Sequence, residues 1–140
     1  MHPGLRQATK ADIPAIFAVR YAVLENTLRP GAITHEDVRL QIEESGRGWV
    51  VESQGRIVAF AIGNAANANV WALFVHPESE HQGHGQQLHA VMVKWLKSCG
   101  CGPLWLTTGA QTRARSFYER LGWQDAGVAE HNQVRLELSE

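Results

Sequence analysis

Apolar residues recur along this 140-residue chain with the two spacings that distinguish strands from helices. Residues 70–75 form an almost unbroken apolar run, which is typical of a central strand buried on both faces. Beyond Pro77 the apolar residues instead recur at helical spacing until Gly100, which predicts an amphipathic helix. The same reasoning predicts further strands at residues 5–8, 49–52, 57–62, 104–106 and 134–138, and helices over residues 9–26, 34–45 and 114–121.

Turn and capping residues separate these segments. Thr34 is a good N-cap, and Asp37, three positions later, is placed to complete a capping box. Gln54 and Gly55 supply a turn between two strands. No repeat, low-complexity tract or linker interrupts the sequence, so we expect a single domain over residues 1–140. The order of elements predicts the α/β (α+β) class, with a central, mostly antiparallel sheet flanked by helices.

The composition is that of a globular protein without a large excess of either charge. The formal net charge is −1, with both signs scattered along the chain, so we expect no nucleic-acid partner and no membrane partner. The run at residues 70–75 is too short to span a bilayer, and residues 1–4 lack the features of a signal peptide. Cys99 and Cys101 are the only cysteines, which favours a reduced, cytoplasmic protein.

Three histidines, His76, His81 and His84, lie close enough in the sequence to raise the question of a metal site. Two of them flank a glycine turn instead of sharing one helix face, and no carboxylate triad is evident. Cys99 and Cys101 are separated by a single residue and have no second cysteine pair, which is not a typical zinc-binding pattern. We therefore predict that the protein holds no metal.

The strongest local indication of chemistry is the segment of residues 75–88, which leads from the buried strand through a glycine-containing turn into the amphipathic helix. Gly83 and Gly85 let the backbone approach a ligand closely. The first helical turn adds N–H groups without acceptors and the positive end of the helix dipole, which together favour a pyrophosphate. The alternative is a plain strand-to-helix turn in which the glycines serve only geometry, and this segment alone does not decide between them.

Three segments, in the family's order, resemble the GNAT acetyltransferases. Residues 83–85 (Gly-His-Gly) resemble the glycines of the cofactor signature Gln/Arg-x-x-Gly-x-Gly/Ala, and residues 75–77 (Val-His-Pro) resemble the step that precedes it. Residues 111–123 resemble the second signature, Asn-x-x-Ala-x-x-Phe-Tyr-x-x-x-Gly-Phe, and residues 5–12 resemble the first strand and helix entry. The resemblance implies a GNAT-like sheet of roughly six to seven strands with about four helices. It also implies an N-acetyltransferase that uses acetyl-coenzyme A (acetyl-CoA).

The resemblance further assigns cofactor contacts, with departures at three positions. The expected contacts are Phe74, Val75, His81, Gln82, Gly83, His84, Gly85, Gln86 and Gln111. Glu80 stands where the family usually has Gln or Arg, which places a carboxylate near the phosphate site. Because that site is made from backbone N–H groups, the Glu80 side chain can point away from it, and His81 or His84 could offset its charge. Gln111 replaces Asn and keeps the amide, and Trp123 replaces the usual Phe, which we interpret as a core substitution.

The mechanism that the resemblance implies is direct attack of an amine on the thioester carbonyl, without an acyl-enzyme. Val75 lies about where the family's fourth and fifth strands splay apart and expose a backbone N–H to the thioester oxygen. Tyr118 matches the family tyrosine that approaches the cofactor sulfur, and a phenol is a suitable general acid for the leaving thiolate. The alternative for Tyr118 is a core aromatic beside Phe117. With the signature matched, we favour the catalytic role.

The general base is less well defined by the sequence. Residues 67–71, at the start of the fourth strand, contain neither an acidic residue nor a histidine. Glu25 and His35 lie in the segment that usually walls the acceptor pocket, and Glu25 is the candidate base or acceptor contact. For both residues the alternative is a solvated helix position, and a chain of water could replace a dedicated base.

The identity of the acceptor is left open by the sequence. We expect a primary amine, carried either by a small molecule or by a protein. Family members often pair, so a homodimer is compatible with the resemblance. A second interpretation from a different class is a non-catalytic acyl-CoA-binding or regulatory module of the same fold, against which the presence of Tyr118 argues.

Overall fold

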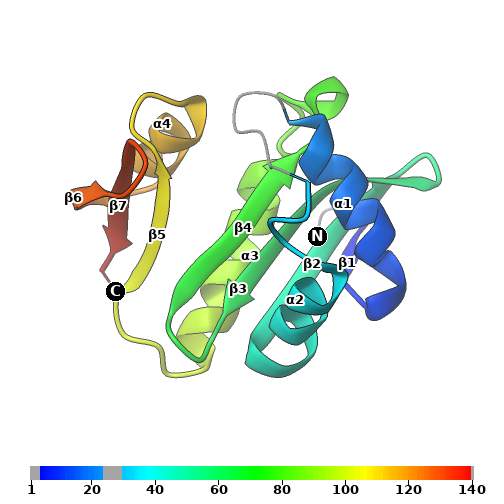
Figure 1. The fold of residues 1–140 in the computed structure, drawn as a ribbon, viewed down its shortest axis with the longest axis horizontal. Helices are drawn as coiled ribbons and strands as arrows, with labels where there is room; N and C mark the ends of the chain where they lie inside the picture. The colour runs from blue at the N-terminus through cyan, green and yellow to red at the C-terminus, as the bar shows by residue number, and fades with distance from the viewer. Residues whose placement is uncertain (1–3, 24–29, 140) are drawn as a thin grey trace.

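The computed structural model describes residues 4–23 and 30–139. Its strands are β1 (Leu5–Gln7), β2 (Gly46–Ser53), β3 (Arg56–Asn64), β4 (Asn69–Val75), β5 (Leu104–Gly109), β6 (Gln124–Ala129) and β7 (Gln133–Leu138). Its helices are α1 (Ile13–Ala22), α2 (His35–Leu40), α3 (His84–Ser98) and α4 (Arg113–Arg120), with short helical turns η1 (Lys10–Asp12), η2 (Gln41–Ser45) and η3 (Pro77–Ser79). Helices α1 and α2 lie on one face of the sheet and α3 on the other (Figure 1). The predicted mixed sheet flanked by helices is confirmed.

The seven strands form one sheet in the order β1-β2-β3-β4-β5-β7-β6. Neighbouring strands are antiparallel except β4 and β5, which are parallel and pair at Asn69 and Trp105. At this junction the backbone N–H of Trp105 donates to the carbonyl of Ala68 (3.1 Å) and its indole N–H to that of Asn67 (2.9 Å). Beyond the junction the two strands separate, as Figure 1 shows, so the sheet opens toward the C-terminal end of β4.

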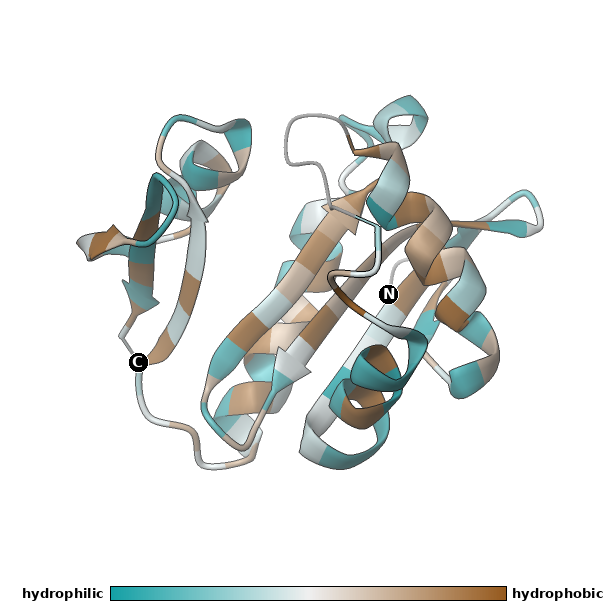
Figure 2. Ribbon diagram, in the orientation of Figure 1, coloured by the Kyte–Doolittle hydropathy of each residue, from teal (hydrophilic) through white to brown (hydrophobic). Residues whose placement is uncertain are grey.

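Apolar side chains fill both faces of the central strands. Ile62 of β3 packs with Ile13 of α1 in the cluster under α1 and α2, and both side chains are fully buried. Leu88 of α3 and Leu136 of β7 are fully buried in a second cluster on the opposite face. In Figure 2 the strands between the helix layers are accordingly brown over much of their length. Burial on both faces explains why the central strands lack the alternation of half-exposed strands.

The predicted helix starts carry the hydrogen bonds expected of capping boxes. The hydroxyl of Thr34 accepts from the N–H of Asp37 (3.1 Å), and the Asp37 carboxylate accepts from the N–H of Thr34 (2.8 Å). At the entry to α1, the Asp12 carboxylate accepts from the N–H of Thr9 (2.8 Å) and from two guanidinium nitrogens of Arg6 (2.9 Å each). The Arg6 hydrogen bonds hold the pKa of Asp12 below its usual value, and this pairing fixes β1 to the start of α1.

The helix predicted over residues 34–45 is divided into α2 and the turn η2, and two further elements differ from the prediction. Helix α1 ends at Ala22, before the predicted end near residue 26, because the backbone of Val23 is already extended (ψ 113°). Strand β6 was not predicted, since five of its six residues are exposed, Val128 at 91% among them. An edge strand that buries so little has no reason to alternate apolar and polar residues, and alternation is what identifies a strand in a sequence. Among the described residues, no helix is long and apolar enough to cross a bilayer.

Candidate functional site

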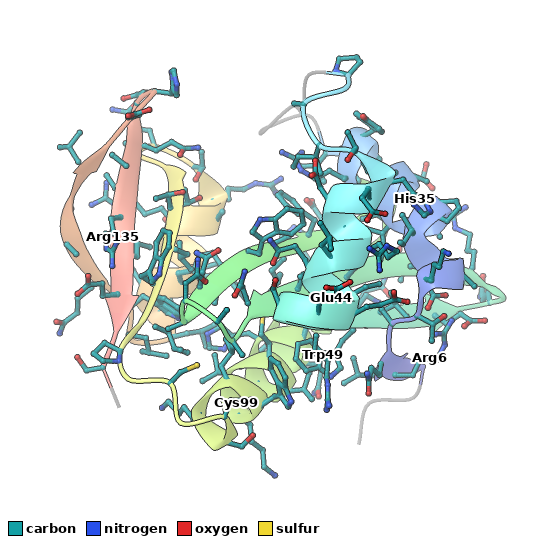
Figure 3. All side chains as sticks on the ribbon, turned by 60° about the horizontal axis from the view of Figure 1, so that its bottom comes forward. Arg6, His35, Glu44, Trp49, Cys99 and Arg135 are labelled. Carbon is teal, nitrogen blue, oxygen red and sulfur yellow. The ribbon has the colours of Figure 1, made fainter. Side chains whose placement is uncertain are left out.

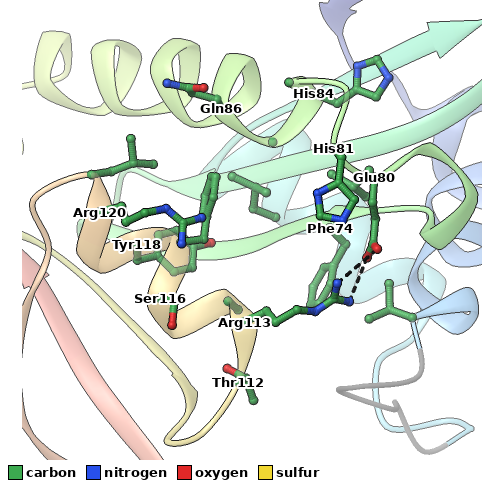
Figure 4. Close-up of a pocket in the computed structure, with 18 of the residues that line it drawn as sticks. Phe74, Glu80, His81, His84, Gln86, Thr112, Arg113, Ser116, Tyr118 and Arg120 are labelled. Atoms are coloured by element: carbon green, nitrogen blue, oxygen red, sulfur yellow. Dashed lines mark hydrogen bonds and ion pairs between the residues drawn. The ribbon is translucent and has the colours of Figure 1, made fainter.

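A cavity of about 1100 Å³ lies beside the end of β4, between the start of α3 and helix α4 (Figure 4). Its lining includes residues 73–75 of β4, residues 79–81 and 83–86 at the start of α3, and residues 112–114, 116–118, 120 and 121 in and around α4. Because β5 diverges from β4, the last residues of β4 border this space instead of another strand. The cavity is large enough for a ligand of cofactor size.

The glycine turn before α3 forms one edge of the cavity. Gly83 is the N-cap of α3 and has left-handed backbone dihedrals (φ 86°), and His81 is also left-handed (φ 65°). A Cβ added to Gly83 would meet no atom within 4 Å, whereas one added to Gly85 would lie 3.5 Å from the ring of Phe117. The first N–H groups of a helix have no acceptor within it, and residues 84–86 border the cavity. Backbone donors and the helix dipole thus favour an anion at this edge.

The residues predicted to contact the cofactor are mostly gathered at this cavity. Those that line it are Phe74, Val75, His81, Gly83, His84, Gly85 and Gln86. Gln82 instead borders a smaller neighbouring cavity of about 310 Å³, together with Arg56 and Glu78. Gln111 does not line the larger cavity, although the next residue, Thr112, does.

The position of Tyr118 is compatible with both alternatives that the sequence left open. Its side chain is buried, and it also borders the cavity. Its ring packs edge-on against those of Phe117 and Trp123, with centroids 5.2 and 5.5 Å away. Burial raises the pKa of its phenol above the ordinary value, so the hydroxyl keeps its proton at neutral pH. Tyr118 therefore lines the cavity from a packed position, with its phenol protonated.

A buried hydrogen bond beside Tyr118 was not predicted. The indole N–H of Trp123 donates to Nε2 of His89 on α3 (2.9 Å), and both side chains are buried. Burial, with a smaller effect from Lys97, lowers the pKa of His89 to about 4, so the imidazole is neutral and its Nε2 can accept. Trp123 is a core residue, as expected, but it also ties α3 to the segment after α4. The one indication in the sequence is a histidine next to Leu88, on the apolar face of the helix.

The His89 imidazole predicts a loss of stability in mild acid. Its pKa in the unfolded chain is about 6.5, so between pH 6.5 and 4 the unfolded state binds the proton and the folded state does not. The free energy of unfolding should therefore fall by about 2–3 kcal/mol between pH 7 and pH 4.5. Urea unfolding at the two pH values measures this change.

The matched variant is His89→Gln, whose amide oxygen can accept from the Trp123 indole N–H without titrating. Between pH 7 and pH 4.5 its free energy of unfolding should therefore change much less than that of the wild type, because most of the predicted loss of about 2–3 kcal/mol comes from His89. The same pH dependence in the wild type and in His89→Gln would show that His89 does not cause the effect.

Glu80 is held by an arginine on the opposite wall of the cavity. Its carboxylate accepts from two nitrogens of Arg113 (3.0 and 3.3 Å), and Figure 4 shows this ion pair as dashed lines. Glu80 borders the cavity, as Arg113 does. Its charge partner is Arg113, where the sequence suggested His81 or His84.

The candidate bases are less well placed. Glu25 lies outside the described residues. His35 is exposed in the first turn of α2 and is labelled in Figure 3. His76 accepts at Nδ1 from the N–H of Glu78 (3.1 Å), which makes it a capping residue. Asn69, at the start of β4, donates its side-chain amide to the carbonyl of Trp105 (3.2 Å) and so serves the strand junction.

The cysteines do not belong to this cavity. Cys99 is exposed at the C-terminal end of α3 (Figure 3), whereas the cavity borders the N-terminal end of that helix. The thiol of Cys101 lies 3.6 Å from the carbonyl of Ala65. Both cysteines are free, and no cluster of three or more potential metal ligands occurs within residues 4–23 and 30–139.

Comparison with known sequences identifies relatives over most of the chain. The profile of the family described as "Acetyltransferase (GNAT) family" matches residues 16–123. The mycothiol acetyltransferase of Pseudarthrobacter chlorophenolicus is 29% identical over 126 residues, a match that covers 80% of this chain and 39% of that relative. The chain thus spans about two fifths of the length of that curated relative.

Solved structures share the fold at low sequence identity. The PaiA N-acetyltransferase from Thermoplasma acidophilum, solved in complex with coenzyme A, superimposes with a TM-score of 0.85 and 16% identity over the full length of both chains. The ribosomal-protein-S18-alanine N-acetyltransferase from Escherichia coli gives a TM-score of 0.78 and 19% identity, over 96% of this chain and 92% of that one.

Proposed function

Because this chain belongs to the GNAT acetyltransferase family, we propose that it transfers an acetyl group from acetyl-CoA to a primary amine. The observation that carries this proposal is the cavity bordered by the end of β4, the glycine turn of α3 and Tyr118. It offers an anion-binding helix start, a separated strand edge and a protonated phenol around one space. The fold neighbour solved with coenzyme A supports the choice of cofactor.

We assign the phosphates of the cofactor to the first turn of α3. Residues 84–86 supply backbone N–H groups there, and Gly83 leaves the approach free of a side chain. The arm that carries the thioester would then run between α3 and α4 toward β4. No metal is needed for this binding mode, since backbone donors and the helix dipole supply the positive potential.

The thioester oxygen is assigned to the backbone N–H of Val75. The N–H of His76 donates to the carbonyl of Val58 in β3 (2.8 Å), and N–H directions alternate along a strand. The N–H of Val75 therefore points away from β3, toward the side that β5 has left. A backbone donor directed at the carbonyl oxygen stabilises the negative charge that develops when the amine attacks.

Tyr118 is assigned the proton transfer to the leaving thiolate. The neutral amine attacks the carbonyl carbon, the C–S bond breaks, and the coenzyme A sulfur takes the phenolic proton. The proton that the acylated nitrogen loses passes to water, and Tyr118 regains a proton from water. The acceptor amine must first lose a proton, because an alkyl ammonium with a pKa near ~10 is not a nucleophile. No acyl-enzyme is formed, so neither free cysteine takes part. Their free thiols fit the cytoplasm, which we propose as the compartment.

A panel of amines tests the proposed activity. The protein would be incubated with acetyl-CoA and a polyamine, amino acids, an aminoglycoside or a peptide with N-terminal alanine, the last suggested by the name of the fold neighbour from Escherichia coli. We expect at least one acceptor to gain an acetyl group, detected by mass spectrometry, with release of an equal amount of thiol. Tight binding of acetyl-CoA without transfer to any amine would instead favour a non-catalytic acyl-CoA-binding module.

We further predict that no single side chain acts as an indispensable base. Residues 67–71 offer no acid or histidine, and His35 is exposed. If water relays the proton, the pH–rate profile should follow the fraction of free amine and shift with the pKa of the acceptor. Glu25→Gln and His35→Gln should each lower kcat/KM by less than about tenfold, or about 1.4 kcal/mol.

Profiles measured with two acceptors of different pKa separate a water relay from a dedicated base. A dedicated base gives the same ionisation with every acceptor, because that ionisation belongs to the enzyme. Complete loss of activity in Glu25→Gln, with cofactor binding intact, would identify Glu25 as the base and contradict the prediction.

A further inference from the structure

The Glu80–Arg113 ion pair joins opposite walls of the cavity. Glu80 precedes the glycine turn at the start of α3, and Arg113 is the first residue of α4. The two guanidinium–carboxylate contacts, at 3.0 and 3.3 Å, connect elements on either side of the opening between β4 and β5. Both side chains border the space assigned to the cofactor (Figure 4).

The chemistry of this pair suits an exchange of partners. The guanidinium fork of arginine binds phosphate oxygens as readily as carboxylate oxygens. The Glu80 carboxylate, in contrast, repels a phosphate, and it lies three residues before Gly83 at the predicted phosphate-binding turn. The Arg113 side chain is 65% exposed and that of Glu80 is 30% exposed, so the pair contributes at most about 1 kcal/mol. A bond this weak can be replaced by a stronger one to a phosphate group.

We propose that a phosphate group of the cofactor replaces Glu80 as the partner of Arg113. The ion pair then closes the empty cavity across its two walls and opens when the cofactor binds. Glu80 lowers cofactor affinity, because the bond it makes to Arg113 must be broken first, and it thereby favours release of coenzyme A after transfer. This inference rests on the proposed function, since it requires that this cavity holds coenzyme A.

A second ion pair on the same helix provides the matched control. Arg115 of α4 donates to Asp125 at 2.9 Å, and both side chains are partly exposed, at 26% and 49%. Neither residue borders the cavity. Asp125→Asn therefore removes a carboxylate partner from an α4 arginine without touching the proposed cofactor site.

Calorimetric titration of coenzyme A tests the exchange in the wild type, Glu80→Gln, Arg113→Gln, the double variant and Asp125→Asn. We expect Glu80→Gln to bind coenzyme A about three- to tenfold more tightly and Arg113→Gln to bind it about tenfold more weakly. Glu80→Gln should tighten binding more when Arg113 is present than when it is Gln, because only then is a bond broken. Asp125→Asn should bind like the wild type.

Truncated ligands identify the phosphate. Pantetheine has neither the pyrophosphate nor the 3′-phosphate, so its affinity should be the same in all variants. If Arg113→Gln also weakens the binding of 3′-dephospho-coenzyme A, the new partner of Arg113 is the pyrophosphate. If Arg113→Gln does not change the affinity for this ligand, the partner is the 3′-phosphate. Both results support the exchange.

Three results would overturn the inference. Unchanged or weaker binding by Glu80→Gln would show that Glu80 does not oppose the cofactor. If Glu80→Gln tightened coenzyme A binding equally with and without Arg113, Glu80 would act only by electrostatic repulsion of the phosphates. If Asp125→Asn tightened coenzyme A binding as much as Glu80→Gln does, the effect would follow from the net charge of the protein and not from the Glu80–Arg113 pair. Failure of the wild type to bind coenzyme A would contradict the proposed function itself, whereas binding and transfer without the predicted variant effects would contradict only the exchange.

Discussion

Tyr118→Phe is expected to lower kcat by between about 10-fold and about 1,000-fold, while the Kd for acetyl-CoA changes by less than about twofold. The substitution removes the hydroxyl that we assign to protonation of the leaving thiolate. It keeps the ring, which packs against Phe117 and Trp123, so the shape of the cavity should be preserved. Steady-state kinetics with a good acceptor, together with calorimetry for the cofactor, measures both quantities.

Tyr21→Phe is the matched control for this substitution. Tyr21 is the other tyrosine of the chain, is 44% exposed on α1, and does not line the cavity. Its variant should retain the wild-type kcat. If Tyr118→Phe also retains the wild-type kcat, Tyr118 is a packing aromatic, and the proton reaches the thiolate from another source.

Gly83→Ala is expected to remove most of the thermal stabilisation that acetyl-CoA gives to the wild type. At 100 times its Kd, a cofactor stabilises a protein by about 2.7 kcal/mol. The added Cβ would occupy open space at the edge of the cavity, where the backbone must approach the phosphates. The left-handed backbone of Gly83 (φ 86°) also strains any other residue, so the variant without cofactor should melt about 4 °C lower.

Gly100→Ala separates the strain from the loss of binding. Gly100 follows the C-terminal end of α3, has nearly the same backbone conformation (φ 83°), and would likewise place a Cβ in open space. Its variant should melt lower without cofactor but gain the full wild-type shift with acetyl-CoA. If acetyl-CoA raised the melting temperatures of Gly83→Ala and Gly100→Ala by the same amount, the phosphates would not bind at Gly83.

The parts of the fold that could be predicted are those in which buried apolar residues recur at regular spacing along the sequence. The apolar run at residues 70–75 predicted β4, and the helical spacing of apolar residues after Pro77 predicted α3, because each pattern records the faces that an element buries. Strand β6 buries almost none of its side chains, so its sequence shows no such pattern. The separation of β4 from β5 depends on the tertiary junction at Trp105 and was expected only from the family resemblance.

The candidate site likewise contains some features that the sequence indicates and others that it does not. The turn at Gly83 is local, so its backbone requirement is visible in the residue type. The pairs Glu80–Arg113 and His89–Trp123 join residues 33 and 34 positions apart, and each forms only because the fold brings α4 and the residues after it next to α3 and the turn before it. A single amino-acid sequence does not indicate which distant partner a charged or buried polar residue will meet.

Amide hydrogen exchange with and without acetyl-CoA tests the location of the cofactor most directly. We expect slower exchange in peptides that cover residues 83–87 and 112–121, because backbone N–H groups at the start of α3 would gain phosphate acceptors and α4 would be covered by the bound cofactor. Exchange in residues 46–56 should be unchanged. Slowing confined to residues 53–58, which border the smaller cavity, with none at residues 83–87, would contradict the assignment of the cofactor to the space between α3 and α4.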